Sequence, residues 1–314
     1  PPFPFPVQLP TPAPSFAYFA AGNLGPNWNA ISSIDRIDYS NDTATASTKG
    51  ALTAVNYSMS GCGTKDYGYI GAGGQQPGPT FSSTDRIDYS NDTATALARG
   101  KLNRAARSTA SASNTTYGYW AGGMTPYPTP TSKVSRLTFA TDTGIQVAKG
   151  NLTTVRRRWH ATGNQSYGYF AGGDPGGTRI DRIDYSNDSP TASPKGPLSV
   201  SRSGHAAAGN ASFGYFINGF AASTSTSVDR LDYSSDTTAM APKGPLTHAS
   251  YGHDAESSRA NALPTENIYS TTVSSSEEVS GTKVITRGTN RGYWGGGYLP
   301  AARSTVDRID FAND

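Results

Sequence analysis

The sequence has little cysteine, little histidine and little net charge. Cys62 is its one cysteine, which excludes an internal disulfide framework. The four histidines have no spacing typical of a metal site, so we predict no metal and no cofactor. The net charge of +3 predicts no nucleic-acid partner, although Arg156, Arg157 and Arg158 form one short basic run. No run reaches the roughly 18 apolar residues of a membrane helix, so we predict no membrane insertion.

The chain is instead rich in small and aromatic residues. It contains 35 glycines, 18 tyrosines, 11 phenylalanines and 4 tryptophans. This aromatic content argues against disorder. Aromatics at regular spacing among turn-forming residues predict many short strands, and therefore an all-β fold.

One eight-residue segment recurs six times. It reads DRIDYSND from Asp35 and appears again, exactly or with substitutions, from five further starts, at Asp85, Ser135, Asp181, Asp229 and Asp307. A second recurring segment is an aromatic run that ends in glycines, such as YGYFAGG from Tyr167. A third reads Lys/Arg-Gly-x-Leu, as at Lys149 to Leu152. These landmarks fit four strands into units of 46 to 50 residues, which is the size of a propeller blade.

The amino-acid sequence of the repeat resembles that of the kelch family of β-propellers. The segment from Val228 to Leu246 is similar to the third and fourth kelch strands, and Gly122-Gly123 and Gly172-Gly173 match the kelch double glycine. This resemblance implies a propeller of six four-stranded blades over residues 16–314. The fourth strands have Ala and Thr where kelch repeats usually carry Trp. The repeat also resembles those of tandem-repeat proteins in the particles of marine bacteriophages.

A charged pair recurs with the repeat. We predict that its arginines donate hydrogen bonds between blades and that its aspartates cap the hairpin turns. A ring of calcium or anion sites is the alternative. The arginines are Arg36, Arg86, Arg136, Arg182, Arg230 and Arg308, and the aspartates are Asp42, Asp92, Asp142, Asp188, Asp236 and Asp314. The first and fourth positions of the segment are also acidic, as at Asp35 and Asp38, but the third copy has Ser135 and Thr138 there.

The loops between the second and third strands differ most between copies, and we expect function to concentrate there. Four of these loops carry an aromatic residue beside Pro or Gly, which suits stacking on a glycan or a protein partner. These predicted binding residues are Trp28, Tyr127, Phe220 and Tyr298.

Two segments depart from the repeat. The interval before the last copy is 78 residues long, which predicts an irregular insert at 254–290 or a degenerate seventh blade. The proline-rich segment 1–15 precedes the first aromatic run. We predict that it runs along the first or last blade and closes the ring.

The sequence therefore predicts a non-catalytic binding or structural propeller. We expect a virion surface or fibre component outside the cell that binds other particle proteins, or a host glycan or protein, and that can be oligomeric. The alternative is a secreted carbohydrate-active enzyme or a copper oxidase, because some kelch-like propellers are oxidases. Repeated identical acids do not form the convergent pocket that such an enzyme needs.

Overall fold

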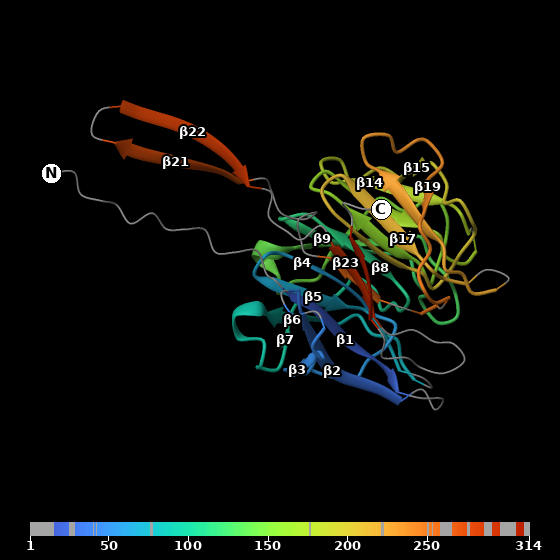
Figure 1. The fold of residues 1–314 in the computed structure, drawn as a ribbon. Coiled ribbons are helices and arrows are strands. Elements are labelled where there is room, and N and C mark those ends of the chain that lie inside the picture. The colour runs from blue at the N-terminus through green and yellow to red at the C-terminus, as the bar shows by residue number, and fades with distance from the viewer. Residues whose placement is uncertain are drawn as a thin grey trace.

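The computed structural model is an all-β propeller (Figure 1). It describes residues 16–24, 29–39, 41, 43–75, 78–175, 177–220, 223–249, 251–252, 254–257, 266–274, 277–285, 291–295 and 306–310. The helical structure in these residues is two short 3-10 turns, Tyr89–Asn91 and Phe139–Thr141. The strands are short because turn residues interrupt the chain every few positions.

Four sheets have the four antiparallel strands that the repeat predicts. We number the propeller sheets in chain order, so these four are sheets 2 to 5. Sheet 2 contains β4 (Ser60–Gly63), β5 (Tyr67–Gly71), β6 (Thr84–Asp88) and β7 (Leu97–Ala98). Sheet 3 contains β8 (Ala110–Ser113), β9 (Tyr117–Ala121), β10 (Val134–Thr138) and β11 (Val147–Lys149). Sheet 4 contains β12 (His160–Gly163), β13 (Tyr167–Ala171), β14 (Ile180–Asp184) and β15 (Ser193–Lys195). Sheet 5 contains β16 (Ala206–Gly209), β17 (Phe213–Ile217), β18 (Val228–Asp232) and β19 (Ala241–Lys243).

Two further sheets have three strands each among the described residues, so four of the six predicted blades have all four strands there. Sheet 1 contains β1 (Phe16–Leu24), β2 (Asn29–Asp38) and β3 (Ser47–Lys49). Sheet 6 contains β20 (Asp254–Ser257), β23 (Arg291–Gly295) and β24 (Val306–Asp310). The segment 1–15, which we predicted to close the ring, lies outside the described residues.

The insert divides between two sheets. Its first residues form β20, which pairs with β23 as an ordinary first strand, so this part of 254–290 is not irregular. The strands β21 (Glu266–Ser274) and β22 (Glu277–Ile285) form a two-stranded sheet. Among the described residues neither strand pairs with a propeller sheet, and so no seventh four-stranded blade is seen there.

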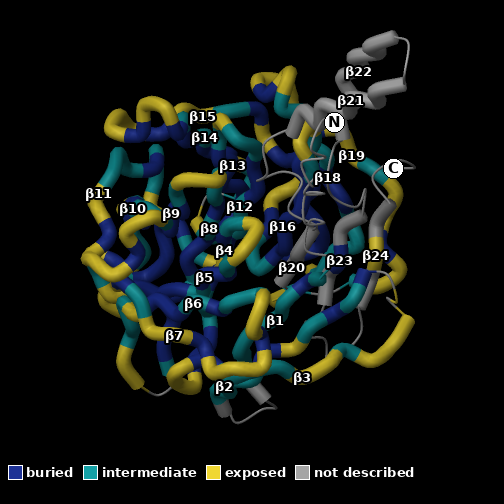
Figure 2. The backbone as a smooth tube through the Cα atoms, turned by 90° about the vertical axis from the view of Figure 1, so that its left-hand side faces the viewer, coloured by how far each residue is buried: buried dark blue, intermediate teal, exposed yellow. Residues whose placement is uncertain are grey.

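The sheets pack in a ring around their first strands. The strand β4 contacts β8, which contacts β12, and the series continues through β16 to β20. Figure 2 shows these inner strands toward the middle and β7, β11 and β15 at the rim. Between sheets 6 and 1, Tyr293 stacks on Tyr39 with ring centroids 4.8 Å apart. The same stack joins sheets 3 and 4 through Tyr119 and Tyr185, so both junctions use one geometry.

The second strands of sheets 2 to 5 are largely buried on both faces. Successive side chains of a strand point to opposite faces, and in a propeller each face packs against a neighbouring sheet. In β13, Phe170 packs in a cluster with Tyr119 of sheet 3, whereas Tyr169 packs in a cluster with Phe216 of sheet 5. Phe170, Tyr169 and Phe216 are fully buried. Each buried aromatic side chain of this size stabilises the fold by about 1.5–3 kcal/mol.

Candidate functional site

The recurring arginine bonds to the turn aspartate of the next sheet. The four Arg–Asp pairs are 2.6–2.8 Å long: Arg36–Asp92, Arg86–Asp142, Arg136–Asp188 and Arg182–Asp236. The aspartate side chains are 6–9% exposed and the arginines 19–23%. Each guanidinium also covers an aromatic ring, as Arg182 covers Tyr167 at 4.1 Å. The pairs therefore join neighbouring sheets, and they repeat with the fold.

Other groups converge on the same carboxylate. Asp236 accepts hydrogen bonds from Tyr169 at 2.9 Å and Arg182 at 2.6 Å, and Lys195 lies 3.1 Å away. Burial opposes ionisation of Asp236, but these donors outweigh it and lower its pKa. Burial and the bond to Asp236 raise the pKa of Tyr169. This node is a structural clamp, because three side chains of sheet 4 share one carboxylate of sheet 5.

The turn cap is a different aspartate from the one predicted. Asp88 accepts hydrogen bonds from the backbone nitrogen and hydroxyl of Ser90, at 2.9 and 2.6 Å, and these bonds lower its pKa. Asp184 and Asp232 do the same in sheets 4 and 5. The clamp aspartates instead direct their carboxylates at the preceding sheet, because the turn brings them to that interface.

Of the remaining predicted charges, the structure describes the two arginines but not the two aspartates. Arg230 covers the Phe213 ring at 4.4 Å, and Arg308 is exposed. Asp42 and Asp314 lie outside the described residues.

The repeated glycines serve close packing. A methyl group at Gly150 would overlap the Pro190 carbonyl oxygen of the next sheet, and Gly150 donates a 2.9 Å hydrogen bond to the Asp188 carbonyl oxygen. At the double glycine, Gly122 and Gly123 have φ of 61° and 87°. A methyl group at Gly122 would overlap Trp159 of the next sheet. These contacts explain both motifs by close packing between neighbouring sheets.

A second buried ion pair was not predicted. Arg156 and Arg202 are almost fully buried and pair with Asp181 and Asp229 at the second position of the third strand. The sequence contained a signal for this pair, because each arginine lies four residues after the leucine of its Lys-Gly-x-Leu segment.

Sheet 3 departs from this second pair. Ser135 replaces the acid, and Arg104 donates to Ser135 at 2.8 Å and to the Lys133 carbonyl oxygen at 2.8 Å. Burial lowers the pKa of Arg104 to about 10, with no described carboxylate beside it. The third repeat has therefore lost this acid and has Ala106 in the place of the buried arginine, and Arg104 is a cation at a different position.

The variable loops and the connections between sheets lie at one end of the propeller, the loop face. Of the predicted binding residues, Trp28 and Tyr298 lie outside the described residues. Tyr127 is 51% exposed and Phe220 45% exposed. The Phe220 ring contacts Tyr251 at 5.7 Å between centroids. No described contact joins Tyr127 to Phe220, so the structure does not bring these two residues into one cluster.

Tyr127 rests on an arginine. The Arg107 guanidinium lies 3.6 Å from the centre of the Tyr127 ring. Arg107 is 3% exposed and donates to the Tyr57 hydroxyl at 2.7 Å and to the Gln75 carbonyl oxygen at 3.4 Å. One face of the tyrosine ring is thus fixed by a buried cation while half of the side chain remains in solvent. The ring is a preorganised stacking platform.

The neighbouring sheet supplies two further arginines. Arg157 donates to Asp174 at 2.9 Å and to the Met124 thioether at 3.3 Å. Arg158 is exposed and has φ of 55°. Its carbonyl oxygen accepts a 2.7 Å hydrogen bond from Gly204 of the next sheet, which holds it at the start of an inner strand. Of the basic run, Arg156 is therefore structural, whereas Arg157 and Arg158 lie on the loop face.

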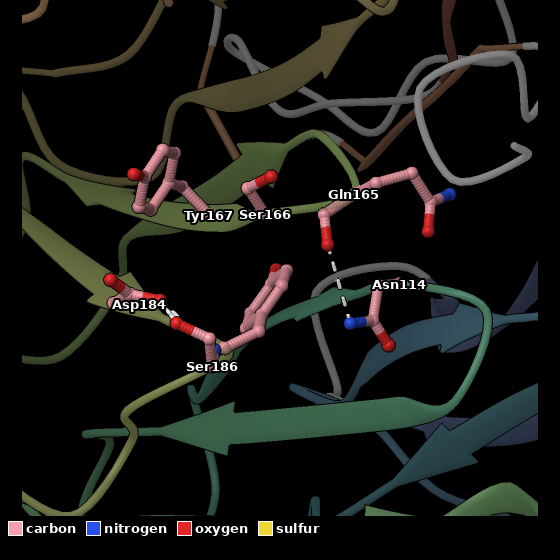
Figure 3. A pocket seen from close by; sticks show the side chains of 7 residues that line it. Asn114, Gln165, Ser166, Tyr167, Asp184 and Ser186 are labelled. Atoms are coloured by element: carbon pink, nitrogen blue, oxygen red, sulfur yellow. Dashed lines mark hydrogen bonds between the residues drawn. The ribbon is translucent and has the colours of Figure 1, made fainter.

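An open hollow lies at the opposite end of the propeller (Figure 3). Repeat turns line it, with Asn114 donating to the Gln165 carbonyl oxygen at 3.3 Å. The Asp184 carboxylate there is occupied by Ser186. The hollow therefore holds ordinary turn residues, and its acid is engaged in a cap.

Histidines offer no assembled metal centre in the described part of the chain, where no group of three potential ligands is found. The ring centroids of His160 and His205 are 5.8 Å apart, and His253 is outside the described residues. His205 is fully buried, and neither ring nitrogen has a described hydrogen-bond partner. Burial lowers its pKa, and the nearby charges of His160, Arg202 and Arg156 lower it further.

No protein-family model and no curated protein matches this chain. Among the described residues, none of the helices is long and apolar enough to cross a membrane. The chain is thus an all-β propeller whose most distinctive surface is the loop face of sheets 3 and 4.

Proposed function

We propose that this chain is a non-catalytic, kelch-like binding propeller of six blades that takes a saccharide on its loop face. The observation that carries the proposal is Tyr127, an aromatic ring half in solvent and fixed from below by Arg107. Saccharides stack their apolar faces on such rings, and a ring already held in place loses little entropy on binding.

The proposed setting is the surface of a virus particle, as a fibre or receptor-binding component. This part rests on the likeness of the repeat to those of bacteriophage particle proteins. The packing supports it indirectly, because a ring of sheets joined by repeated clamps is a rigid scaffold for exposed loops. Antibodies against the chain should label intact particles and reduce their adsorption to host cells. Labelling of lysate but not of particles would contradict this setting.

The saccharide proposal is tested by calorimetric titration with neutral and acidic oligosaccharides. Tyr127→Ala should weaken binding at least tenfold. Ile145→Ala is the control, because Ile145 is 65% exposed and lies in the turn after the third strand, at the other end of sheet 3. Equal loss in both variants, or no binding by the unmodified chain, would overturn the proposal. Chemical conversion of the bound saccharide would overturn the non-catalytic assignment and favour the carbohydrate-active enzyme.

A further inference from the structure

The surface around Tyr127 has more cations than it can pair. Arg107, Arg157 and Arg158 belong to this surface, and the ion pair that they make among the described residues is that of Arg157 with Asp174. Asp174 is engaged with Arg157 alone. The whole chain has a net charge of +3, so an excess of two positive charges here is a large share of it.

Arg107 is the most unusual member. The buried Arg156 and Arg202 each pair with an acid, as Arg202 pairs with Asp229 at 2.8 Å. Arg107 instead has neutral acceptors, the Tyr57 hydroxyl and the Gln75 carbonyl oxygen, and it shares this property with Arg104. A buried cation held by neutral groups is costly unless a negative charge approaches it. Arg107 stands where other repeats have Tyr57, Arg157 or Ser203, and the third repeat also has Ser135 and Thr138 in place of two acids.

The other two arginines have donor groups to spare. One end of the Arg157 guanidinium meets the Met124 thioether, which is a weak acceptor. The Arg158 side chain makes no hydrogen bond or ion pair with the described residues, and its left-handed backbone stands where other repeats have Ser58, Ser108 or Gly204. Small residues fit that conformation more easily than arginine does. Burial raises the pKa of the Tyr57 hydroxyl, and the charges of Arg107 and Arg158 oppose that rise, so both lie near it.

We infer that the loop-face site binds an acidic saccharide, with its ring on Tyr127 and its carboxylate or sulfate on Arg157 and Arg158. This inference rests on the proposed saccharide function and adds the charge of the ligand. Guanidiniums suit both groups, because their parallel N–H donors match two oxygens of one anion. Arg107 lies beneath the ring and strengthens the local positive field without touching the ligand.

A single-stranded nucleic acid is the competing anionic ligand. Such chains bind along grooves that combine several aromatic platforms with a track of cations. Here one described platform, Tyr127, lies beside two arginines, and Phe220, the other exposed loop aromatic, contacts Tyr251 instead. A site with one platform and one anion position fits a sugar unit with a single acidic group better.

The test compares matched ligands on the full chain. The probes are oligogalacturonate, its carboxyl-reduced neutral form, a sulfated carrageenan oligomer and oligo-dT. We expect one acidic saccharide to bind at least tenfold more tightly than the neutral form, and the preferred one identifies the anion. Arg158→Asn should remove this preference for the acidic form. Asparagine tolerates the left-handed backbone, so the variant tests charge and not folding.

The outcomes separate the two proposals. Equal binding of charged and neutral saccharides, still lost in Tyr127→Ala, would overturn the acidic ligand and leave the saccharide site standing. Failure of every saccharide to bind would overturn both. Tightest binding of oligo-dT would replace the saccharide by a nucleic acid.

Discussion

The clamp between sheets 4 and 5 gives a quantitative prediction for Asp236→Ala. The substitution leaves Arg182, Lys195 and Tyr169 without the carboxylate that they share at 2.6–3.1 Å. Removing one partner of a fully buried ion pair costs about 3–5 kcal/mol. Arg182 is 22% exposed and regains some hydration. We therefore expect a loss of about 3 kcal/mol in the free energy of unfolding.

Two companion variants make this prediction specific. Arg182→Ala should cost less, about 2 kcal/mol, because Lys195 and Tyr169 stay on Asp236. Asp174→Ala is the matched control, since the Asp174 side chain is 45% exposed and its ion pair should be worth under about 1 kcal/mol. Urea unfolding followed by tryptophan fluorescence and far-UV circular dichroism measures all three. If Asp236→Ala destabilised no more than Asp174→Ala, the clamp would not hold the sheets together.

Three other predictions concern glycine, histidine and metal. Gly150→Ala should destabilise by about 2 kcal/mol or more, because the new methyl group meets the Pro190 carbonyl oxygen, whereas Gly144→Ala, with no atom near its methyl group, should change stability by under about 1 kcal/mol. A reversed order in thermal melts would refute the close-approach explanation. The pKa of His205 is depressed in the folded state, so its contribution to stability should be present above pH 6.5 and lost as pH falls below that value. His205→Phe should flatten this part of the stability–pH profile, and an unchanged slope would show that another group titrates there. EDTA should leave the melting temperature unchanged, because the clamp aspartates bind side-chain donors, and a sharp decrease would favour calcium.

The sheets could be predicted from the sequence because each repeat carries its own strand and turn signals. The alternation in the strand from Ile180 to Asp184 places Arg182 and Ile183 on opposite faces within one sheet. The clamp partner was harder to assign, since Asp236 belongs to the next repeat, 54 residues later. The alternation within a strand determines the face of the sheet on which a side chain lies. The packing of neighbouring sheets determines which residue that side chain contacts.

The candidate site was predictable in part. Tyr127 and Phe220 stood out because they occupy loops that vary between repeats. Arg107 did not, because it lies outside those loops and reaches Tyr127 from a connection between sheets. Comparing repeats position by position gives the missing signal. Arg158 stands where other copies have Ser or Gly, a departure that strand packing does not require.

We propose that the loop face of sheets 3 and 4 binds an acidic saccharide, and a bound complex tests this directly. The most direct measurement is a crystal structure of the chain with a bound acidic trisaccharide. We expect a sugar ring to stack on the exposed face of Tyr127, and the carboxylate or sulfate of the sugar to lie within hydrogen-bond distance of Arg157 or Arg158. A saccharide bound in the hollow beside Gln165 and Ser186, with Tyr127 uncovered, would contradict it.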